Sequence, residues 1–493
     1  MQKNLIDKFS EECDKVCFSK DEHEIDKLLS QMHNYENKYS QDKTGIAHIL
    51  FCIGNLYTEK AKLKNEKITD WRIGCLPENL VNSLNYFRKA AAVVNDKSYP
   101  NNKYEIQTNI ANSLSHFCRA IEAIELYTFE YDQDKKYDAY FVAPFSKAKT
   151  LTWLAPILND PSHSDYYYYE AYQIYKKLIK NAHKITYSEL KDELVNSSHI
   201  KNIIDLGDKN ASKLKTFKQL SANTRFRSKK EFLYRKWCAD NCLFLNPMND
   251  LTKELFVTHD ILQFPDYMVD NIEEGPYFPS AFSDIKNKYC KARYLFYSSL
   301  FESYPKWLEQ GLYLTDTLDY VDFSTGTEML KIAQKQCFSV LDSLTKLLVK
   351  YFKIKSQKNT YFKPDWFVKN LSNIDNCFID ALFYLSCDLS NFKQANNNIE
   401  IIPHADYLKD FRNNYEHNWV RIAAEKRYPL RNQINDYATI KTREDLEKDV
   451  LKSFKIARSA MLYFTFAVSD NERKNCKNDR MVVNIQTPIY IPW

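Results

Sequence analysis

Apolar residues recur every three or four positions along most of the 493-residue chain, and short polar breaks separate the periodic segments. This spacing is typical of amphipathic α-helices. In the first part of the chain it predicts helices over residues 3–18, 22–39, 44–64, 78–95, 104–130, 145–158 and 166–183. Further along it predicts helices over residues 284–303, 304–319, 327–353, 364–370, 375–392, 404–427 and 442–469. We therefore expect an all-α protein.

Two segments in the first half resemble each other and indicate a repeat. VNSLNYFRKA at 81–90 and ANSLSHFCRA at 111–120 share the pattern N-S-L-x-x-F-x-basic-A at an offset of thirty residues. A unit of roughly this length is typical of stacked helical hairpins such as tetratricopeptide (TPR) repeats, whose period is about 34 residues. We therefore expect a TPR-like helical-repeat domain over residues 1–242.

The remainder of the chain divides into a connector, a bundle and a tail. Residues 243–283 hold four of the fifteen prolines together with several Asn and Asp, which predicts an irregular connector. The periodic segments that follow predict a helical bundle over residues 284–470. Residues 471–493 end in MVVNIQTPIYIPW, where β-formers alternate with prolines, and they predict an extended tail.

The amino-acid composition further restricts the fold class and the kinds of ligand that we expect. Only seven glycines are present, whereas all-β and Rossmann-type folds use glycine in turns and phosphate loops, so the helical interpretation is strengthened. The net charge of +5 permits nucleic acid binding without requiring it. The twelve cysteines are scattered and form no C-x-x-C pair, which favours reduced, buried thiols over a zinc site. We expect neither a metal nor a cofactor.

The sequence gives no indication of membrane insertion or export. The N-terminus, MQKNLIDKFSEECDK, carries acidic residues and no apolar run, unlike a secretory signal. The longest apolar stretches, such as SAMLYFTFAV near residue 460, are about ten residues long, which is too short to span a bilayer. We expect a cytoplasmic protein that does not contact a membrane.

Residues 213–237, KLKTFKQLSANTRFRSKKEFLYRKW, interleave basic and aromatic side chains. Charge for phosphates and rings for bases are what a single-stranded nucleic acid groove needs. The alternative is a solvated helix face in a lysine-rich protein. The candidate contacts here are Arg225, Arg227, Lys229 and Lys230. A separate aromatic stripe predicts either a stacking groove or, more commonly, packing between helices, and it consists of Tyr168, Tyr172 and Tyr175.

The segment DYLKDFRNNYEHNWVRIAA at 406–424 is the clearest candidate site, because its RNNYEH centre is unusually polar for a helix. At about 100° per residue, Asn413, His417 and Arg421 share one helical stripe. Arg412 lies about 140° around the helix from His417. The two side chains therefore converge only through a bend, a long arginine reaching round, or a second copy of the chain. A solvated face with an incidental histidine is the alternative.

RNNYEH resembles the R-N-x-x-x-H form of the R-x4–6-H motif of the HEPN superfamily, helical bundles found in many prokaryotic ribonuclease toxins and defence proteins. The surroundings resemble one bacterial subgroup, which joins N-terminal helical repeats to a C-terminal HEPN domain. The segments that carry this likeness are YRKWCADNCLFLNPMNDL at 234–251, KARYLFYSSLFE at 291–302, CFSVLDSLTKLLVKYF at 337–352, IDALFYLSCDL at 379–389 and RNNYEH itself.

The resemblance implies a metal-independent endoribonuclease, in which the 2′-hydroxyl of the RNA attacks the neighbouring phosphate. Arg412 and His417 match the catalytic pair of the superfamily, and Asn413 matches its usual polar neighbour. A histidine can transfer the required proton, and an arginine can hold the phosphate and stabilise its developing charge. Arg421 and Arg293 are further candidates for RNA contact.

The resemblance also implies the partners. They are an RNA substrate, a second copy of the chain that forms a homodimer through the HEPN domain, and a protein or nucleic-acid trigger acting at the repeats. The implied role is that of a toxin or an abortive-infection effector in antiviral defence. The alternative is a non-catalytic helical-repeat and HEPN scaffold that binds nucleotides, RNA or a protein partner. His404 is a rival histidine, and Asp342 either supports the site or is a half-buried structural carboxylate.

Overall fold

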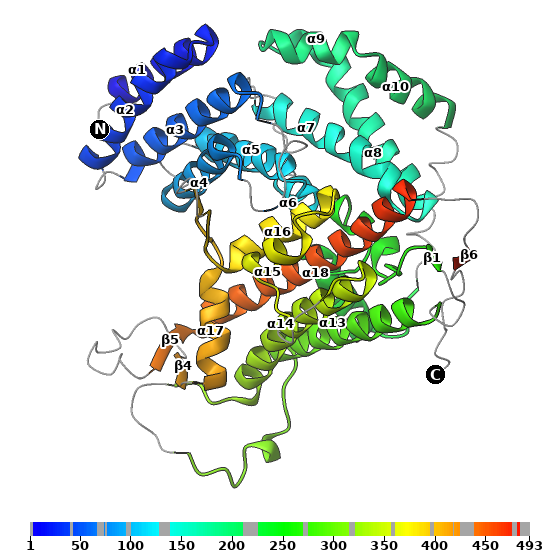
Figure 1. The fold of residues 1–493 in the computed structure, drawn as a ribbon. Helices are drawn as coiled ribbons and strands as arrows, with labels where there is room; N and C mark the ends of the chain where they lie inside the picture. The colour runs from blue at the N-terminus through cyan, green and yellow to red at the C-terminus, as the bar shows by residue number, and fades with distance from the viewer. Residues whose placement is uncertain are drawn as a thin grey trace. The chain divides into compact units, whose positions relative to one another are not determined.

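A computed structural model gives the fold (Figure 1), and it describes residues 3–39, 43–66, 73, 76–94, 100–127, 139–210, 225–269, 275–314, 321–355, 360–394, 399–417, 419–423, 438–475 and 481–483. Helices dominate, which confirms the predicted all-α class. The chain forms two compact units. The N-terminal unit comprises Met1–Gln219, Leu371–Tyr384 and Asn391–Ile402, and the C-terminal unit comprises Leu220–Asn370, Leu385–Ser390 and Pro403–Trp493. The domain limits drawn from the sequence stay predictions.

The N-terminal unit is a succession of helices in which neighbours along the chain pack together. Its elements are α1 (Lys3–Ser19), α2 (Glu22–Lys38), α3 (Lys43–Leu63), α4 (Glu78–Val93), α5 (Pro100–His116), α6 (Ala120–Leu126), α7 (Ala139–Leu154), η2 (Ala155–Ile157), α8 (Pro161–Lys180), η3 (Ala182–Lys184), α9 (Ser188–Asn196), α10 (Ser198–Asn210), the first turns of α16 (Cys377–Leu389), β2 (Phe392–Lys393) and β3 (Glu400–Ile401). Helix α3 packs on α2 and α4, and α8 packs on α7 and α10. This arrangement is consistent with helical repeats, while the TPR class stays a prediction.

Two of the scarce glycines allow helices of this unit to approach closely. A Cβ atom at Gly54 in α3 would lie 2.5 Å from the ring of Phe87 in α4. A Cβ atom at Gly207 in α10 would lie 2.2 Å from the ring of Tyr172 in α8. Of the three tyrosines in the predicted stripe, Tyr172 and Tyr175 are almost fully buried in this packing, whereas Tyr168 is 37% exposed. The tyrosine stripe therefore serves mainly to join helices, the commoner of the two expected roles.

The two similar decapeptides adopt different local structures. The first lies wholly within α4, whereas the second crosses the end of α5 and the start of α6. Cys118 adopts a left-handed conformation, with φ of 56°, at this break. The N–H groups of Cys118 and Arg119 donate to the carbonyls of Ser115 and Leu114, which is the Schellman pattern of a helix end. The shared letters therefore do not mark one repeated structural unit.

A segment from late in the chain completes the N-terminal unit. In α16, the ring of Phe378 lies 5.5 Å from that of Trp153, and the ring of Tyr384 lies 4.3 Å from that of Phe117. The short antiparallel hairpin of β2 and β3 follows. Asn85 in α4 forms two hydrogen bonds with the backbone at the end of this hairpin. Contacts that distant in sequence cannot be read from periodicity.

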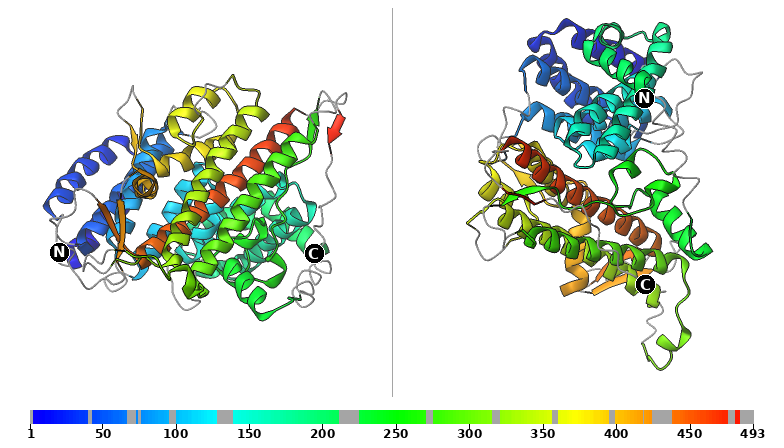
Figure 2. Two further views of the ribbon diagram at one scale, coloured as in Figure 1. Left: turned by 90° about the horizontal axis from the view of Figure 1, so that it is seen from below. Right: turned by 90° about the vertical axis from the view of Figure 1, so that its right-hand side faces the viewer.

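The C-terminal unit is built around three long helices (Figure 2). Its elements are α12 (Lys229–Asp240), η4 (Pro247–Asp250), η5 (Leu255–Val257), β1 (Tyr267–Val269), α13 (Tyr277–Phe301), η7 (Lys306–Leu308), α14 (Thr325–Tyr351), α15 (Pro364–Leu371), the last turns of α16, α17 (Asp406–His417), β4 (Trp419–Ala423), β5 (Ala438–Thr442), α18 (Arg443–Lys474) and β6 (Met481–Val483). Helices α13, α14 and α18 pack on one another and enclose an aromatic core, in which Phe296 stacks on Phe454 and Phe282 on Phe464. Helix α14 runs parallel to α18 and antiparallel to α13.

Several helix boundaries differ from the sequence-based prediction. The helix predicted over 304–319 does not form in its described part, residues 304–314, which contains only the short η7 and leaves Trp307 and Tyr313 68% and 98% exposed. Residues 315–319 lie outside the described residues. Gly311, with a left-handed φ of 82°, interrupts a continuous helix there. Of the predicted extended tail at 471–493, the first residues belong to α18, which ends at Lys474, and residues 481–483 form β6, which pairs antiparallel with β1. Within the described ranges, every helix is too short or too polar to cross a membrane.

Candidate functional site

The candidate segment folds as a helix followed by a strand. Helix α17 ends at His417, and β4 begins at Trp419 and pairs in parallel with β5. The predicted helix over 404–427 is therefore wrong, because residues such as Trp419 and Ile422 favour extended backbone and find a partner strand. Arg421 consequently lies on β4 and is partly buried there, away from the helical stripe that carries His417.

The three motif residues all lie in the last two turns of α17. By helical geometry, Arg412 and His417 are separated by about 7.5 Å along the helix axis and about 140° around it. Asn413 is partly buried and sits one turn before His417. The side chains of Arg412 and His417 lie outside the described residues. The backbone thus keeps the angular separation that the sequence predicts.

A small sheet holds the end of α17 against the long helices. Val321, just before α14, forms a bridge with Ala423 of β4, and the Asp322 N–H donates to the Ile422 carbonyl at 2.6 Å. The Asp322 carboxylate accepts a hydrogen bond from Thr327 and pairs with Arg443, the first residue of α18, at 3.3 Å. Burial of Asp322 opposes its ionisation, but these hydrogen bonds leave its pKa below the usual range.

Tyr407 fastens the first turn of α17 to α18. The ammonium groups of Lys441 and Lys452 lie 4.9 and 5.2 Å from the centre of its ring, in cation–π contact. Lys452 also donates to the Tyr407 hydroxyl at 3.3 Å, and Lys441 pairs with the buried Asp449. Burial, reinforced by the negative charge of Asp449, raises the pKa of Tyr407 to about 12, so its hydroxyl stays neutral at physiological pH. This contact orients the helix that carries the motif.

His404 is held just before α17 by a buried carboxylate. Its Nδ1 lies 3.0 Å from Oδ1 of Asp388, whose side chain is only 1% exposed. The Ala405 N–H also donates to the Asp388 carbonyl at 2.9 Å. The helix between Asp406 and His417 is about 16 Å long. His404 therefore cannot act with His417 of the same chain on one phosphate, and its contacts fit a role in fixing the start of α17.

The basic stretch at residues 213–237, whose last part belongs to α12, is only partly described. Lys213, Lys215 and Lys218 lie outside the described residues, whereas the four candidate contacts are exposed: Arg225, Arg227, Lys229 and Lys230. Lys230 pairs with Glu302 at 3.0 Å. The ring of Trp237 packs on Phe296 and Phe301 of α13. The charges therefore face solvent, while this ring is occupied in packing.

Arg293, a predicted RNA contact, is buried and bound within the protein. Its guanidinium pairs with Asp260 through bonds of 2.8 and 2.6 Å, and it also donates to the Leu243 carbonyl and the Tyr234 hydroxyl. Burial raises the pKa of the Asp260 carboxyl, but Arg293 outweighs this effect and lowers it to about 2. Asp342 accepts the Phe362 N–H at 3.1 Å, a structural contact.

A second buried arginine was not predicted from the sequence. Arg458 in α18 pairs with Asp250 through bonds of 2.7 and 2.9 Å, and it donates to the carbonyls of Phe244 and Asn246. Both charged side chains are almost fully buried. Arg458 and Arg293 thus tie the connector to α18 and α13. The apolar run SAMLYFTFAV directly after Arg458 indicates a buried helix, but nothing in the local sequence indicates the partner Asp250.

The described residues contain no cluster of His, Cys, Asp or Glu that could hold a metal ion. The described cysteines are free thiols, and most of them are buried.

Comparison with known protein families identifies the C-terminal part of the chain. Residues 269–471 match the family model of LA2681-like HEPN. This range includes the three long helices, the small sheet and α17 with its motif. The chain therefore has a C-terminal HEPN domain, as its sequence resemblance predicted. No curated protein and no solved structure matches the chain.

Proposed function

We propose that the protein is a metal-independent endoribonuclease whose HEPN domain cleaves RNA. One observation carries the proposal: the R-N-x-x-x-H motif lies on one helix, α17, inside the range that matches LA2681-like HEPN. A scaffold that only binds a partner has no chemical need for both Arg412 and His417. Their joint presence favours the enzyme over the non-catalytic alternative.

The chemistry assigns a role to each residue of the motif. The 2′-hydroxyl of the RNA attacks the adjacent phosphorus, the bond to the 5′-oxygen breaks, and a 2′,3′-cyclic phosphate forms. His417 takes the 2′ proton or gives a proton to the departing 5′-oxygen. Arg412 stabilises the extra negative charge on the phosphate. Asn413 orients the histidine or the phosphate.

A second copy of the chain completes this site. Proton removal and proton donation occur on opposite sides of the phosphate, so one histidine does not serve both. Within one chain, Arg412 and His417 also point about 140° apart around the helix. A two-fold dimer through the HEPN domain would place two motifs in one cleft and supply both groups. We therefore include a homodimer in the proposal.

The proposed biological role is that of a toxin or an abortive-infection effector in antiviral defence, controlled by a trigger at the helical repeats. This role rests on the resemblance to HEPN defence proteins. The exposed basic residues Arg225, Arg227, Lys229 and Lys230, together with Arg421 on β4, are proposed to contact the RNA away from the reacting phosphate. Their positive charge attracts the phosphate backbone irrespective of its sequence.

The test is cleavage of total RNA by the full-length chain in EDTA, with analysis of the fragment ends. The wild-type protein is expected to leave 2′,3′-cyclic or 3′-phosphate ends. His417→Ala and Arg412→Ala should each lower the rate by about 10²- to 10⁴-fold, the usual contribution of a proton-transfer or oxyanion-stabilising group. The full chain is needed, because a fragment beginning at residue 284 would lose Asp250 and Asp260 and leave two arginines buried without partners.

His404→Ala is the matched control, since it removes the other histidine close to α17. Its cleavage rate should stay within about tenfold of the wild-type rate, because His404 contacts a structural carboxylate and not the motif. Intact RNA with the wild-type protein would overturn the proposal, and so would equal cleavage by the wild-type and His417→Ala proteins.

A further inference from the structure

A lysine-lined hollow lies between the N-terminal end of α13 and the C-terminal end of α14. It has a volume of about 890 Å³ and is open to solvent. Lys346, Lys350 and Lys353 line it against a single acidic residue, Asp284. The hydroxyls of Ser343 and Thr360 and the ring of Tyr277 complete its polar and aromatic lining.

Two of the lysines in this hollow carry a charge that the described part of the protein does not neutralise. Lys346 and Lys350 are exposed, and neither has a carboxylate partner among the residues that the structure describes. Other surface lysines of the same unit are paired, such as Lys331 with Glu328 and Lys448 with Glu444, both at 2.6 Å. Two uncompensated ammonium groups in a concave surface create a local positive potential that attracts an anion.

The spacing of these groups suits a strand of phosphates. Lys346 and Lys350 are one helical turn apart, so their α-carbons are separated by about 6 Å along α14. Tyr277 is 50% exposed and packs edge-on against Phe278, which fixes its ring. Lysines for phosphates and an aromatic face for a base are the usual parts of a site for single-stranded nucleic acid.

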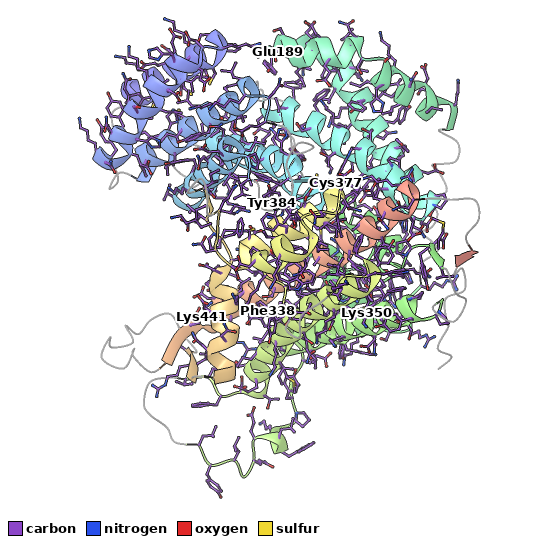
Figure 3. All side chains as sticks on the ribbon, viewed as in Figure 1. Glu189, Phe338, Lys350, Cys377, Tyr384 and Lys441 are labelled. Atoms are coloured by element: carbon purple, nitrogen blue, oxygen red, sulfur yellow. The ribbon has the colours of Figure 1, made fainter. Side chains whose placement is uncertain are left out.

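The hollow is remote from the motif helix. The sheet that follows α17 contacts the chain just before α14, at Val321, whereas the hollow lies near the other end of α14. From Gly326 to Lys346 the helix extends about 30 Å. Figure 3 shows Lys350 and Lys441 of β5 at opposite ends of the bundle. A ligand in the hollow therefore cannot occupy the proposed catalytic site of the same chain.

We infer that this hollow is a second, non-catalytic site that binds the phosphate backbone of single-stranded RNA. The inference rests on the proposed ribonuclease function and deepens it: the substrate is an unpaired strand long enough to reach from α17 to the far end of the bundle. An open hollow with separated lysines fits a continuous strand better than a mononucleotide, since nucleotide pockets enclose most of their ligand.

The test measures binding without cleavage, in full-length protein that carries His417→Ala. A fluorescein-labelled oligouridylate is the probe, and fluorescence anisotropy gives the dissociation constant at several salt concentrations. Lys346→Glu combined with Lys350→Glu should weaken binding about tenfold or more and reduce the log–log salt slope by about 1.4, for two lost phosphate contacts. The control, Lys291→Glu with Lys335→Glu, makes the same change in charge on exposed positions of the same two helices.

The outcomes of this binding experiment test the second site independently of the proposed ribonuclease activity. Equal affinities and salt slopes for the two double variants, or the absence of RNA binding altogether, would overturn the second site even if the wild-type protein cleaves RNA. Selective loss of binding in the Lys346 and Lys350 variant would support the site even if the wild-type protein is inactive. Competition by AMP or ATP as effective as that by the oligonucleotide would overturn RNA as the ligand in favour of a nucleotide.

Discussion

Residues 243–262, the first part of the connector, and the motif helix α17 are both held in place by basic side chains, but these side chains differ in burial. The connector is fastened by Arg293 and Arg458, which are buried and bound to carboxylates and carbonyls. Helix α17 is fastened by Lys441 and Lys452 around the partly exposed ring of Tyr407. In the connector both cations are almost fully buried, whereas Lys441 and Lys452 near α17 are partly exposed.

This difference shows why the type of residue alone does not indicate function. A buried arginine must find partners inside the protein, because an unpaired buried charge is strongly destabilising. The guanidinium groups of Arg293 and Arg458 are therefore occupied by neighbouring carboxylates and carbonyls. A substrate has to be met by the exposed groups, such as those at residues 225–230 and in the hollow beside α14.

The largest expected effect is a loss of stability when the buried arginine that holds the connector is replaced. Arg458→Met should lower the free energy of unfolding by about 3–5 kcal/mol, because it leaves Asp250 buried and unpaired. Urea unfolding of the full-length chain, followed by circular dichroism, measures this loss. The double variant Arg458→Met with Asp250→Leu should regain much of it, since an apolar pair of similar volume removes the unpaired charge.

The surface pair of Lys448 and Glu444 provides the control for this experiment. Lys448→Ala should leave the free energy of unfolding almost unchanged, because an exposed ion pair one turn apart contributes little to stability. A loss in Arg458→Met no greater than that in Lys448→Ala would show that the buried pair does not hold the connector.

A smaller loss of stability is expected at low pH, where the carboxylate of the buried pair Asp260–Arg293 becomes protonated. The pKa of Asp260 is lowered from 3.8 to about 2 in the folded protein. A lowered folded-state pKa contributes stability that is present above the unfolded-state pKa, near pH 4, and disappears as the pH falls from about 4 to 2. The contribution is about 2 kcal/mol. Thermal unfolding midpoints measured across this pH range should therefore fall.

The double variant Arg293→Met with Asp260→Asn is the comparison for the acid experiment. The amide oxygen that Asp260→Asn introduces can still accept the Leu245 N–H, which the carboxylate accepts at 2.8 Å in the wild-type protein. The unfolding midpoint of this variant should fall less steeply between pH 4 and pH 2 than that of the wild-type protein, because the variant lacks the titrating carboxyl. Parallel curves for the two proteins would assign the acid sensitivity to other carboxylates.

The smallest loss of stability is expected when the contact between Tyr407 and the two lysines, which orients α17, is removed. Tyr407→Leu removes the ring between two lysines and should destabilise the protein by about 1–2 kcal/mol. Tyr407→Phe keeps the ring and loses only the hydrogen bond from Lys452, so its loss should be about 1 kcal/mol or less. If the ring positions the motif, RNA cleavage should fall in Tyr407→Leu and persist in Tyr407→Phe. Equal cleavage by both variants would limit Tyr407 to a role in stability.

Several helix ends in this chain could not be predicted from the sequence. A glycine after a helix usually marks its end, but this chain ends helices with other residues in the left-handed conformation, namely Asn65, Cys118, Cys242 and Lys353. Each of them, with the residue that follows it, donates backbone hydrogen bonds in the Schellman pattern without glycine. The break between α5 and α6 was missed for this reason.

The candidate site was only partly predictable for a related reason. The resemblance of RNNYEH to the HEPN motif was visible because its spacing is local, and the helix that carries it followed from its own sequence. The strand after it was not predicted, since β4 depends on pairing with β5 and with Val321. Tyr407, Lys441 and Lys452 had no pattern in common, because the contact among them joins distant segments.

By itself, the sequence determined that the protein is all-α, because helical periodicity is a property of neighbouring residues. Its resemblance to HEPN proteins predicted the C-terminal HEPN domain, because the segments that carry the resemblance are local. Only the tertiary structure decided which charges are available. It placed Arg293 and Arg458 inside the fold with Asp260 and Asp250, and it left Lys346 and Lys350 facing an open hollow. Burial and pairing arise from contacts between segments far apart in the chain, and no local pattern records them.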